Sequence, residues 1–182
     1  PYERLYIQWS LSKFFPAKTM GSHVTNWNKN TSVKFRTDVC SSCKLGFDID
    51  LKSLSEDDYK FVQQAVKNYN SMKPVILEGD QYRLVSPYEG SHCAVNYVSK
   101  DKQRAVLFAY DLHPRYKEPQ MNVKLQGLNP TKLYTVKETN LMPGKTSELE
   151  CDGKQYSGDY LMKVGLSVFS AQDGTSHVLT LE

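Results

Sequence analysis

Two patterns of apolar and polar residues divide the chain near Asp80. In residues 1–80, runs with apolar residues three or four positions apart alternate with short apolar runs, which predicts helices alternating with strands. In residues 81–182, period-two and aromatic or β-branched runs separated by turn residues predict strands throughout. The sequence therefore predicts two parts of different fold class.

The first part is expected to begin with a helix over PYERLYIQWSLSKFF that ends at Pro16. This run places eight apolar residues among its first fifteen, which is too many for a single stripe, so we expect the helix to be buried on more than one side. The helix start has no capping residue before Pro1, which suggests a chain cut from a longer one. No signal peptide is visible.

Further elements follow in residues 19–80. TMGSHVT predicts a strand, NWNKN a polar loop, TSVKFRTDVCSSC a helix capped by Thr31, and LGFDID a second strand. Ser55 is expected to cap the clearest helix of the chain, and Pro74 to end it. The apolar spine of the second helix consists of Val33, Phe35, Val39 and Cys43, and that of the third of Tyr59, Val62, Val66 and Tyr69.

The second part carries seven strand candidates, with the charged KDKQ stretch as a hairpin tip. Short strands with turn signals every ten to fifteen residues predict an antiparallel β-sandwich that is self-sufficient. The candidates are YRLVS, HCAVNYVS, RAVLFAYDL, MNVKL, KLYTVKE, the segment from Tyr156 to Phe169, and SHVLTL.

The first part is not expected to stand alone. Helices alternating with strands imply a parallel sheet, and two strands with three helices cannot cover both faces of one. Because a closed (β/α)8 barrel takes ~250 residues, we interpret residues 1–80 as the incomplete tail of such a barrel, followed by the sandwich at 81–182.

Composition and charge exclude several classes of function. Hydrophobic residues make up 40% of the 182 and the formal charge is +3, and neither part has the basic excess of a nucleic-acid surface. No apolar run approaches the ~20 residues that span a bilayer. The chain is expected to bind neither nucleic acid nor membrane.

The four cysteines predict no metal site. Cys40 and Cys43 form a C-x-x-C, but Cys93 and Cys151 stand alone with no second pair at similar spacing. The pair also follows a helical run, unlike the dithiol at the helix start of a thioredoxin-like unit. We interpret the cysteines as small buried residues.

Catalytic motifs are few. Nucleotide-binding glycine loops and the G-x-S-x-G elbow are absent. His92, His113 and His177 are single and are interpreted as structural, whereas His23 lies at the tail of a predicted strand of the barrel and is as well suited to an active-site face. Asp48 and Asp50 flank Ile49 as paired carboxylates would, but a solvated strand edge explains them better.

Several strings resemble, in order and spacing, the C-terminal portion of bacterial α-galactosidases of glycoside hydrolase family 36. The resemblance covers nearly the whole chain, and it implies a catalytic (β/α)8 barrel followed by an antiparallel β-sandwich. The strings are ERLYIQWSLSKFFPAKTMGSHVTNWN, KFRTDVCSSCKLGFDIDLKSLSEDD, YNSMKPVILEGDQYRLVSP and SGDYLMKVGLSVF.

The resemblance implies a retaining mechanism without cofactor or metal. In the family an aspartate of a Lys-Trp-Asp motif is the nucleophile, and the aspartate of a Ser-Asp shortly before Glu-Arg-Leu is the acid/base. Glu3, Arg4 and Leu5 match the last of these motifs, but neither carboxylate is in this sequence. The chain alone is therefore expected to be inert, within a parent that hydrolyses galactose-containing oligosaccharides and is often tetrameric.

The resemblance also suggests roles for single residues. Gly21, His23 and Val24 match Gly-x-His-Val near the seventh barrel strand, so His23 is the expected substrate-binding residue. Arg36 is expected to tie barrel elements together, and Asp48 to lie in the eighth strand. The departure at Ser41–Cys43, where the family has larger apolar residues and a glycine, puts the local helix packing in doubt.

Two alternatives stay open. The first is a free-standing carbohydrate-binding or interaction module, because the chain has 21 aromatic residues and flat rings stack on sugars. Exposed tyrosines along a groove would favour it, and buried aromatics would favour the scaffold. The second is a family relative with altered sugar specificity.

Overall fold

The computed structural model describes residues 1–27, 30–119 and 121–182. Asn28 and Lys29 of the expected polar loop lie outside the described residues. The first part of the chain contains α1 (Tyr2–Leu11), η1 (Ala17–Thr19), β1 (Gly21–Thr25), α2 (Val33–Ser41), β2 (Lys44–Asp48), η2 (Leu51–Ser53) and α3 (Glu56–Glu78).

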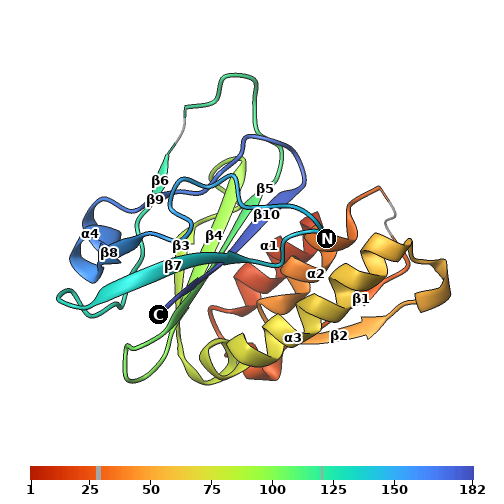
Figure 1. The fold of residues 1–182 in the computed structure, drawn as a ribbon, viewed down its shortest axis with the longest axis horizontal. Helices are drawn as coiled ribbons and strands as arrows, with labels where there is room; N and C mark the ends of the chain where they lie inside the picture. The colour runs from red at the N-terminus through yellow and green to blue at the C-terminus, as the bar shows by residue number, and fades with distance from the viewer. Residues whose placement is uncertain (28–29, 120) are drawn as a thin grey trace.

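The change from mixed to predominantly β structure falls where the sequence predicts it, between the end of α3 and the start of β3 (Figure 1). The predicted KDKQ tip lies between β4 and β5. The remaining elements are β3 (Asp80–Val85), β4 (His92–Val98), β5 (Ala105–Asp111), β6 (Asn122–Val123), β7 (Leu133–Thr139), β8 (Gln155–Ser157), α4 (Gly158–Lys163), β9 (Leu166–Ser167) and β10 (Thr175–Leu181).

A six-stranded antiparallel sheet of order β3-β4-β5-β10-β7-β8 forms the centre of the molecule. All residues of β4 and β5 are buried, so these strands have no solvent-facing side. Such strands have a nearly continuous apolar run instead of an alternation, as in AVLFAYD of β5. Both faces of this sheet must therefore be covered.

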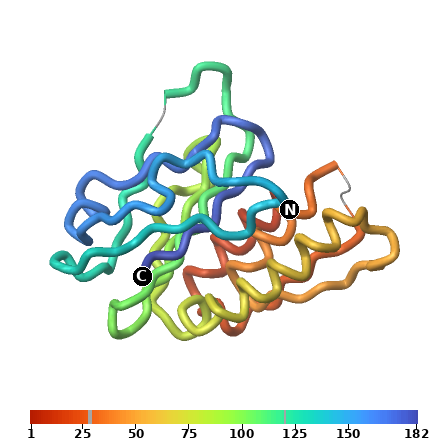
Figure 2. Tube along the Cα trace, viewed as in Figure 1, coloured from red at the N-terminus to blue at the C-terminus, as the bar shows by residue number. Residues whose placement is uncertain are grey.

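Helices α1, α2 and α3 cover one face. In Figures 1 and 2 they lie between the six-stranded sheet and the two-stranded parallel sheet β1-β2. The division of the chain into two domains stays a prediction, because one core cluster contains residues from both sides of Asp80. Its members include Leu5, Trp9, Phe35, Val39, Met72 and Ile76 from the helices, and Val95, Tyr97, Val106, Phe108, Tyr110 and Val178 from the strands.

The other face is covered within the second part of the chain. Its core cluster joins Leu107 and Leu179 of the large sheet to Leu161 of α4 and Leu166 of β9. The antiparallel pairing predicted for this part is confirmed, but the opposing layer is small: the two-stranded sheet β6-β9, α4 and irregular segments.

The segment from Tyr156 to Phe169 was expected to be a strand, and this is wrong. Only β8 and β9 at its ends are extended, while α4 occupies Gly158–Lys163 between them. The hydroxyl of Ser157 accepts a hydrogen bond from the Tyr160 N–H at 3.1 Å, which caps this short helix. The apolar residues of this segment are typical of a strand. The cap at Ser157 instead stabilises the short helix α4.

Helix α1 is shorter and less buried than expected. It ends at Leu11, and only Leu5 and Trp9 are buried within it. Ile7 is 56% exposed and Phe14, in the turn after the helix, is 81% exposed. The apolar residues of this run occupy more than one side of the helix. Within the described residues, however, only the side that carries Leu5 and Trp9 is buried.

The two following helices differ from expectation at single residues. Ser32, not Thr31, caps α2, since its hydroxyl accepts from the Phe35 N–H. Ser55 caps α3 as predicted, but Pro74 lies inside that helix, which continues to Glu78. A proline inside a helix costs ~3 kcal/mol. Burial of Val75 and Ile76 stabilises the last turn by about 1.5–3 kcal/mol for each side chain, which outweighs that cost.

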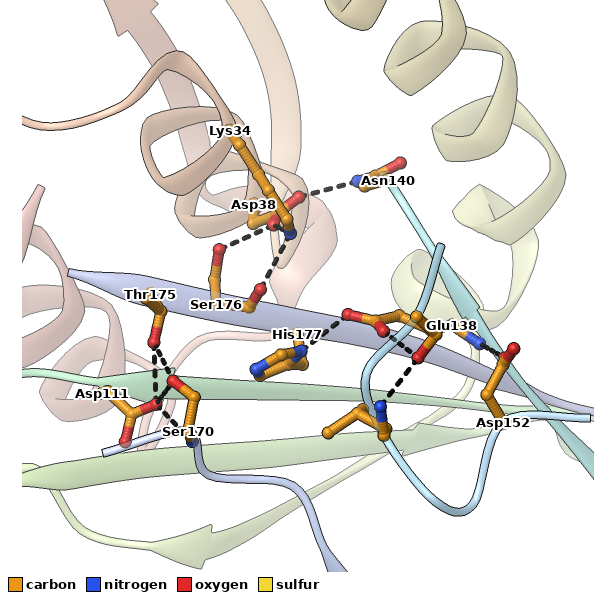
Figure 3. Close-up of polar contacts among 12 residues, drawn as sticks. Lys34, Asp38, Asp111, Glu138, Asn140, Asp152, Ser170, Thr175, Ser176 and His177 are labelled. Atoms are coloured by element: carbon orange, nitrogen blue, oxygen red, sulfur yellow. Dashed lines mark hydrogen bonds and ion pairs between the residues drawn. The ribbon is translucent and has the colours of Figure 1, made fainter. Parts of the chain in front are cut away.

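Asp38 of α2 connects the helices to the sheet. It is fully buried, and Figure 3 shows its carboxylate accepting from Lys34 Nζ at 2.6 Å, Ser176 Oγ at 2.7 Å and Asn140 Nδ2 at 2.8 Å. The backbone carbonyl of Asp38 accepts from the Tyr110 hydroxyl at 3.0 Å. One residue of α2 thus binds groups from β5, from β10 and from the end of β7.

Replacing Asp38 by Asn should destabilise the fold strongly. The substitution leaves Lys34 without its buried counter-charge and can turn an amide N–H₂ toward the donor of Asn140, so we expect a loss of about 3–5 kcal/mol in unfolding free energy. Urea unfolding followed by circular dichroism measures it. The matched control is Lys60→Gln, which removes an exposed (i, i+4) pair with Glu56 and should cost no more than about 0.5 kcal/mol. Equal effects of the two substitutions would contradict the structural role of Asp38.

Candidate functional site

The parallel pair β1-β2 presents one face to the helices and leaves the other open. Ser22 and Val24 of β1 are buried toward the helices. Because strand side chains alternate, His23 projects to the opposite face, where it is exposed. The predicted substrate-binding residue therefore lies on the open side of the small sheet.

His23 lies directly against its register partner, Gly46 of β2. A Cβ atom built on Gly46 would lie 2.0 Å from the His23 Cδ2 and 2.4 Å from its Nε2. Only a glycine leaves room for the imidazole in this position. The glycine of the Leu-Gly-Phe-Asp string is therefore required by the position of the His23 ring.

Arg4 fixes the backbone of β1 beside His23. Its Nη1 donates to the His23 carbonyl at 2.6 Å and to the Ser22 hydroxyl at 3.0 Å, and it lies 3.3 Å from the Cys40 sulfur. Charge-assisted hydrogen bonds of this kind are stronger than neutral ones. The first helix therefore holds the strand at the position from which His23 projects.

Arg36 performs the same task from the second helix. Its Nη1 donates to the Thr25 carbonyl at 2.7 Å, which ties α2 to the carboxyl end of β1. Its Nε is buried and has no hydrogen-bond partner among the described residues. Both arginines thus have a structural role at β1.

A small cleft of about 30 Å³ opens at the carboxyl end of β1. Its charged side chains are the guanidinium groups of Arg4 and Arg36, and Trp27 beside them is 78% exposed. No aspartate or glutamate lines it within the described residues. The guanidinium groups can donate hydrogen bonds to a ligand in this cleft. The described residues of the cleft offer no carboxylate for nucleophilic or acid/base chemistry.

Asp48 and Asp50 do not act as a pair. Asp48 is the last residue of β2, exposed, and pairs in register with Thr25. Asp50 caps η2, where its Oδ1 accepts from the Lys52 N–H at 3.0 Å. This arrangement agrees with a solvated strand edge.

The remaining histidines pair with carboxylates inside or around the large sheet. His92 Nδ1 lies 2.9 Å from Asp111 Oδ1, His177 Nδ1 lies 2.6 Å from Glu138 Oε1, and His113 Nδ1 lies 3.2 Å from Asp173 Oδ1. Figure 3 shows the His177–Glu138 pair beside the Asp38 cluster. These contacts support the structural interpretation of the three residues.

The four cysteines are buried and unpaired, and the described residues contain no group of three or more side chains that could hold a metal ion. Burial raises the pKa of the Cys43 and Cys93 thiols to about 12 and that of Cys151 to about 11. It also raises the pKa of Cys40, against the lowering effect of Ser22 and Arg4. The C-x-x-C therefore lacks the low thiol pKa of a redox pair.

The polar residues at Ser41 and Ser42 are accommodated by α2 itself. The Ser41 hydroxyl donates to the Thr37 carbonyl at 2.8 Å, and that of Ser42 to the Val39 carbonyl at 3.0 Å. Because these buried hydroxyls are satisfied, the departure from the expected pattern does not disturb the helix.

Sequence reasoning assigned no role to the side chain of Arg4 and none to Trp27. Arg4 lies one turn into a helix whose periodicity indicates packing only, and Trp27 lies in a loop outside every periodic run. Periodicity identifies faces of elements, so contacts made by a long side chain to a neighbouring strand leave no pattern in the sequence.

Comparison with known families assigns both parts of the chain. Residues 1–79 match the model described as Melibiase, and residues 92–181 match the glycosyl hydrolase family 36 C-terminal domain. These matches define the chain as part of a glycoside hydrolase. It belongs to glycoside hydrolase family 36, and its residues 92–181 form the C-terminal domain of that family.

Individual relatives agree with this assignment. The chain is 31% identical over 186 residues to probable α-galactosidase C of Aspergillus flavus, covering 98% of this chain and 23% of the relative. It is 31% identical over 168 residues to α-galactosidase 1 of Pediococcus pentosaceus, covering 89% and 21%. The chain thus spans less than a quarter of the length of these relatives.

Solved structures show the same fold. The α-galactosidase AgaB of Geobacillus stearothermophilus superposes with a TM-score of 0.85 at 27% identity, covering 100% of this chain and 24% of that one. A variant of AgaA from the same organism, solved in complex with raffinose, gives a TM-score of 0.85 at 26% identity, again over 100% and 24%. Another AgaA variant was solved with stachyose.

Substituting Gly46 by Ala should displace the imidazole of His23. The new Cβ would overlap the ring, and the ring can swing outward because this face is open, so we expect shifted His23 ring resonances at a stability cost below about 1 kcal/mol. Two-dimensional ¹H–¹³C NMR of the histidine rings measures the effect. Gly21→Ala, on the same strand face with nothing within 4 Å of its Cβ, is the control and should leave His23 unchanged. Unaltered His23 resonances in Gly46→Ala would refute the contact.

The thiols should resist modification in the folded chain. Three of them have a pKa of about 11–12, so well below 1% is thiolate at pH 8, and Ellman's reagent should react with none at a measurable rate until urea unfolds the protein. The same shifts should lower stability above about pH 9, because unfolded thiols release protons that the folded ones retain. Rapid modification of a Cys43-only variant in native buffer would contradict this assignment.

Proposed function

We propose that this chain is the C-terminal portion of a retaining α-galactosidase that removes terminal α-linked galactose from oligosaccharides of the raffinose type. The names of the relatives support the reaction class, and the raffinose and stachyose complexes of AgaA support the class of substrate. In this proposal the parent enzyme is a homo-oligomer and uses no metal or organic cofactor, since two carboxylates suffice for retaining hydrolysis.

Residues 1–80 are, in this proposal, the tail of a (β/α)8 barrel. The support is the order of layers: two adjacent strands run parallel, their helices cover one side, and the other side is open. In a closed barrel that open side faces the interior, and residues near the carboxyl ends of strands form the active site. The exposed Ile7 and Phe14 of the first helical segment are then surfaces for neighbouring elements of the parent enzyme.

His23 is proposed to contact substrate. It projects from the open face of β1 and its position depends on Gly46, so its ring is set by the backbone of the next strand. Arg4 and Arg36 hold the carbonyls of His23 and Thr25. A neutral sugar hydroxyl can both donate to and accept from such an imidazole.

The proposal that the chain alone is inactive is carried by one observation: no carboxylate lines the cleft beside His23 within the described residues. A retaining enzyme needs two carboxyl groups about 5 Å apart. Asp48 offers a single carboxylate on this sheet, and Asp50 faces the backbone of Lys52. We place the nucleophile and the acid/base in the remainder of the parent enzyme.

A chromogenic α-galactoside tests this proposal. The purified 182-residue chain should release no more chromophore than buffer, while an intact family 36 α-galactosidase in the same assay serves as the positive control. Release above buffer that His23→Ala abolishes would overturn the proposal of inactivity, because the activity would then belong to this chain and not to a contaminant.

A free-standing sugar-binding module is the second candidate. Tyr97, Tyr110 and Tyr134 are fully buried in the two cores, where they pack and donate hydrogen bonds to backbone carbonyls. The scaffold role therefore accounts for these aromatic residues.

A further inference from the structure

A groove of about 850 Å³ lies where the segment joining β3 to β4, the segment joining β5 to β6, and helix α1 meet. Residues 112–119, from the β5–β6 segment, rise above the sheet at the top of Figure 1. Ligand sites are typically 300–1,000 Å³. The groove shares no lining residue with the cleft beside His23, so it is a separate feature.

Two tyrosines present large exposed rings along this groove. Tyr88 is 62% exposed, yet its hydroxyl lies 2.9 Å from Ser10 Oγ and its ring makes an edge contact with Tyr6 at 5.0 Å between centroids. Tyr116 is 91% exposed, with Lys117 Nζ 5.4 Å from its ring centroid. The Tyr88 ring, held by its contacts with Ser10 and Tyr6, offers an apolar surface at little entropic cost, and Tyr116 adds a second, more exposed ring.

Glu118 supplies a fixed acceptor in the lining of the same groove. Its Oε2 accepts from the Arg115 N–H at 2.9 Å, and its Oε1 lies 3.9 Å from His92 Nε2. The hydrogen bond from the Arg115 backbone lowers the pKa of Glu118, so the side chain is ionised at neutral pH.

A buried layer supports Glu118 from behind. His92 is buried and lies 2.9 Å from Asp111 Oδ1, while its ring stacks on Phe169 at 4.1 Å. The other oxygen of Asp111 accepts from the hydroxyls of Ser170 and Thr175, each at 2.8 Å. In a binding site, the residues that contact the ligand are usually held in position by packed and hydrogen-bonded neighbours.

We propose that this groove binds a neutral oligosaccharide. The flat rings of Tyr88 and Tyr116 match the C–H faces of a hexose, and the Glu118 carboxylate accepts from its hydroxyls. The lining carries acidic Glu89 and Glu118 together with basic Arg115 and Lys117, so it favours neither a polyanion nor a polycation. The site deepens the second candidate function, sugar binding, and is independent of the catalytic proposal, since it needs no catalytic carboxylate and no part of the His23 cleft.

Titration of the ¹⁵N-labelled 182-residue chain with raffinose, followed by NMR, tests the proposal. We expect saturable shifts of backbone amides in residues 86–91 and 112–118, with a dissociation constant of about 1–10 mM, the range expected for one or two stacked sugar units. Tyr116→Ala should weaken binding about three- to tenfold through loss of stacking, and Glu118→Gln about fivefold through loss of a charged acceptor.

Two controls locate the effect. Tyr59→Ala removes an exposed tyrosine of α3 that does not line the groove, and His23→Ala removes the side chain proposed for the other site. Both variants should leave the raffinose-induced shifts of the groove amides, in residues 86–91 and 112–118, unchanged. Groove amides that stay unshifted at about 100 mM raffinose would overturn the proposal and leave protein contact as the role of the groove. Shifts lost in His23→Ala but kept in Tyr116→Ala would overturn it too, because the sugar would then bind at the cleft.

Discussion

The fold depends on burying both faces of the central sheet. Strands β4 and β5 have no solvent-facing side, so apolar side chains alternate between two cores along each strand. One core is completed by the small sheet β6-β9 and α4, and the other by α1, α2 and α3. At roughly 25 cal/mol per Å² of apolar surface removed from water, side chains such as Tyr97, Phe108 and Tyr110 are strongly stabilising only while the helices cover them. The position of β1, and with it His23, is a consequence of this covering.

Polar groups then fix where the helices lie on the sheet. Apolar contacts are non-directional, and they would tolerate a sliding of α2 across the strands. The carboxylate of Asp38, bound by Lys34, Ser176 and Asn140, permits one position only. Arg36, two residues before Asp38, is bound to the end of β1. A short path of direct contacts therefore runs from β10 through α2 to the strand that carries His23.

Much of this arrangement could be predicted from the sequence, because most elements have a local cause. Ser55 and the acidic turn after it specify the start of α3, and the runs of β4, β5 and β10 specify strands. The failures also have local causes: Pro74 is tolerated because packing outweighs its cost, and α4 forms where a serine cap competes with a strand-like run. The place of His23 at the tail of a predicted strand suggested an active-site face, and the resemblance to a family then suggested substrate binding. The groove beside Tyr88 could not be predicted, because it joins three segments far apart in the sequence.

The shared core sets where such proteins can exchange segments during evolution. The secondary structure changes between α3 and β3, so a junction for recombination could be expected there. A new C-terminal sheet joined at this point would have to pack against Leu5, Phe35 and Met72. It would also have to supply hydrogen-bond donors to Asp38. A sheet that meets only the first requirement would leave a carboxylate buried with too few donors. Recombination that carries α1–α3 together with the sheet would avoid this conflict, because both halves of the shared core would then move together.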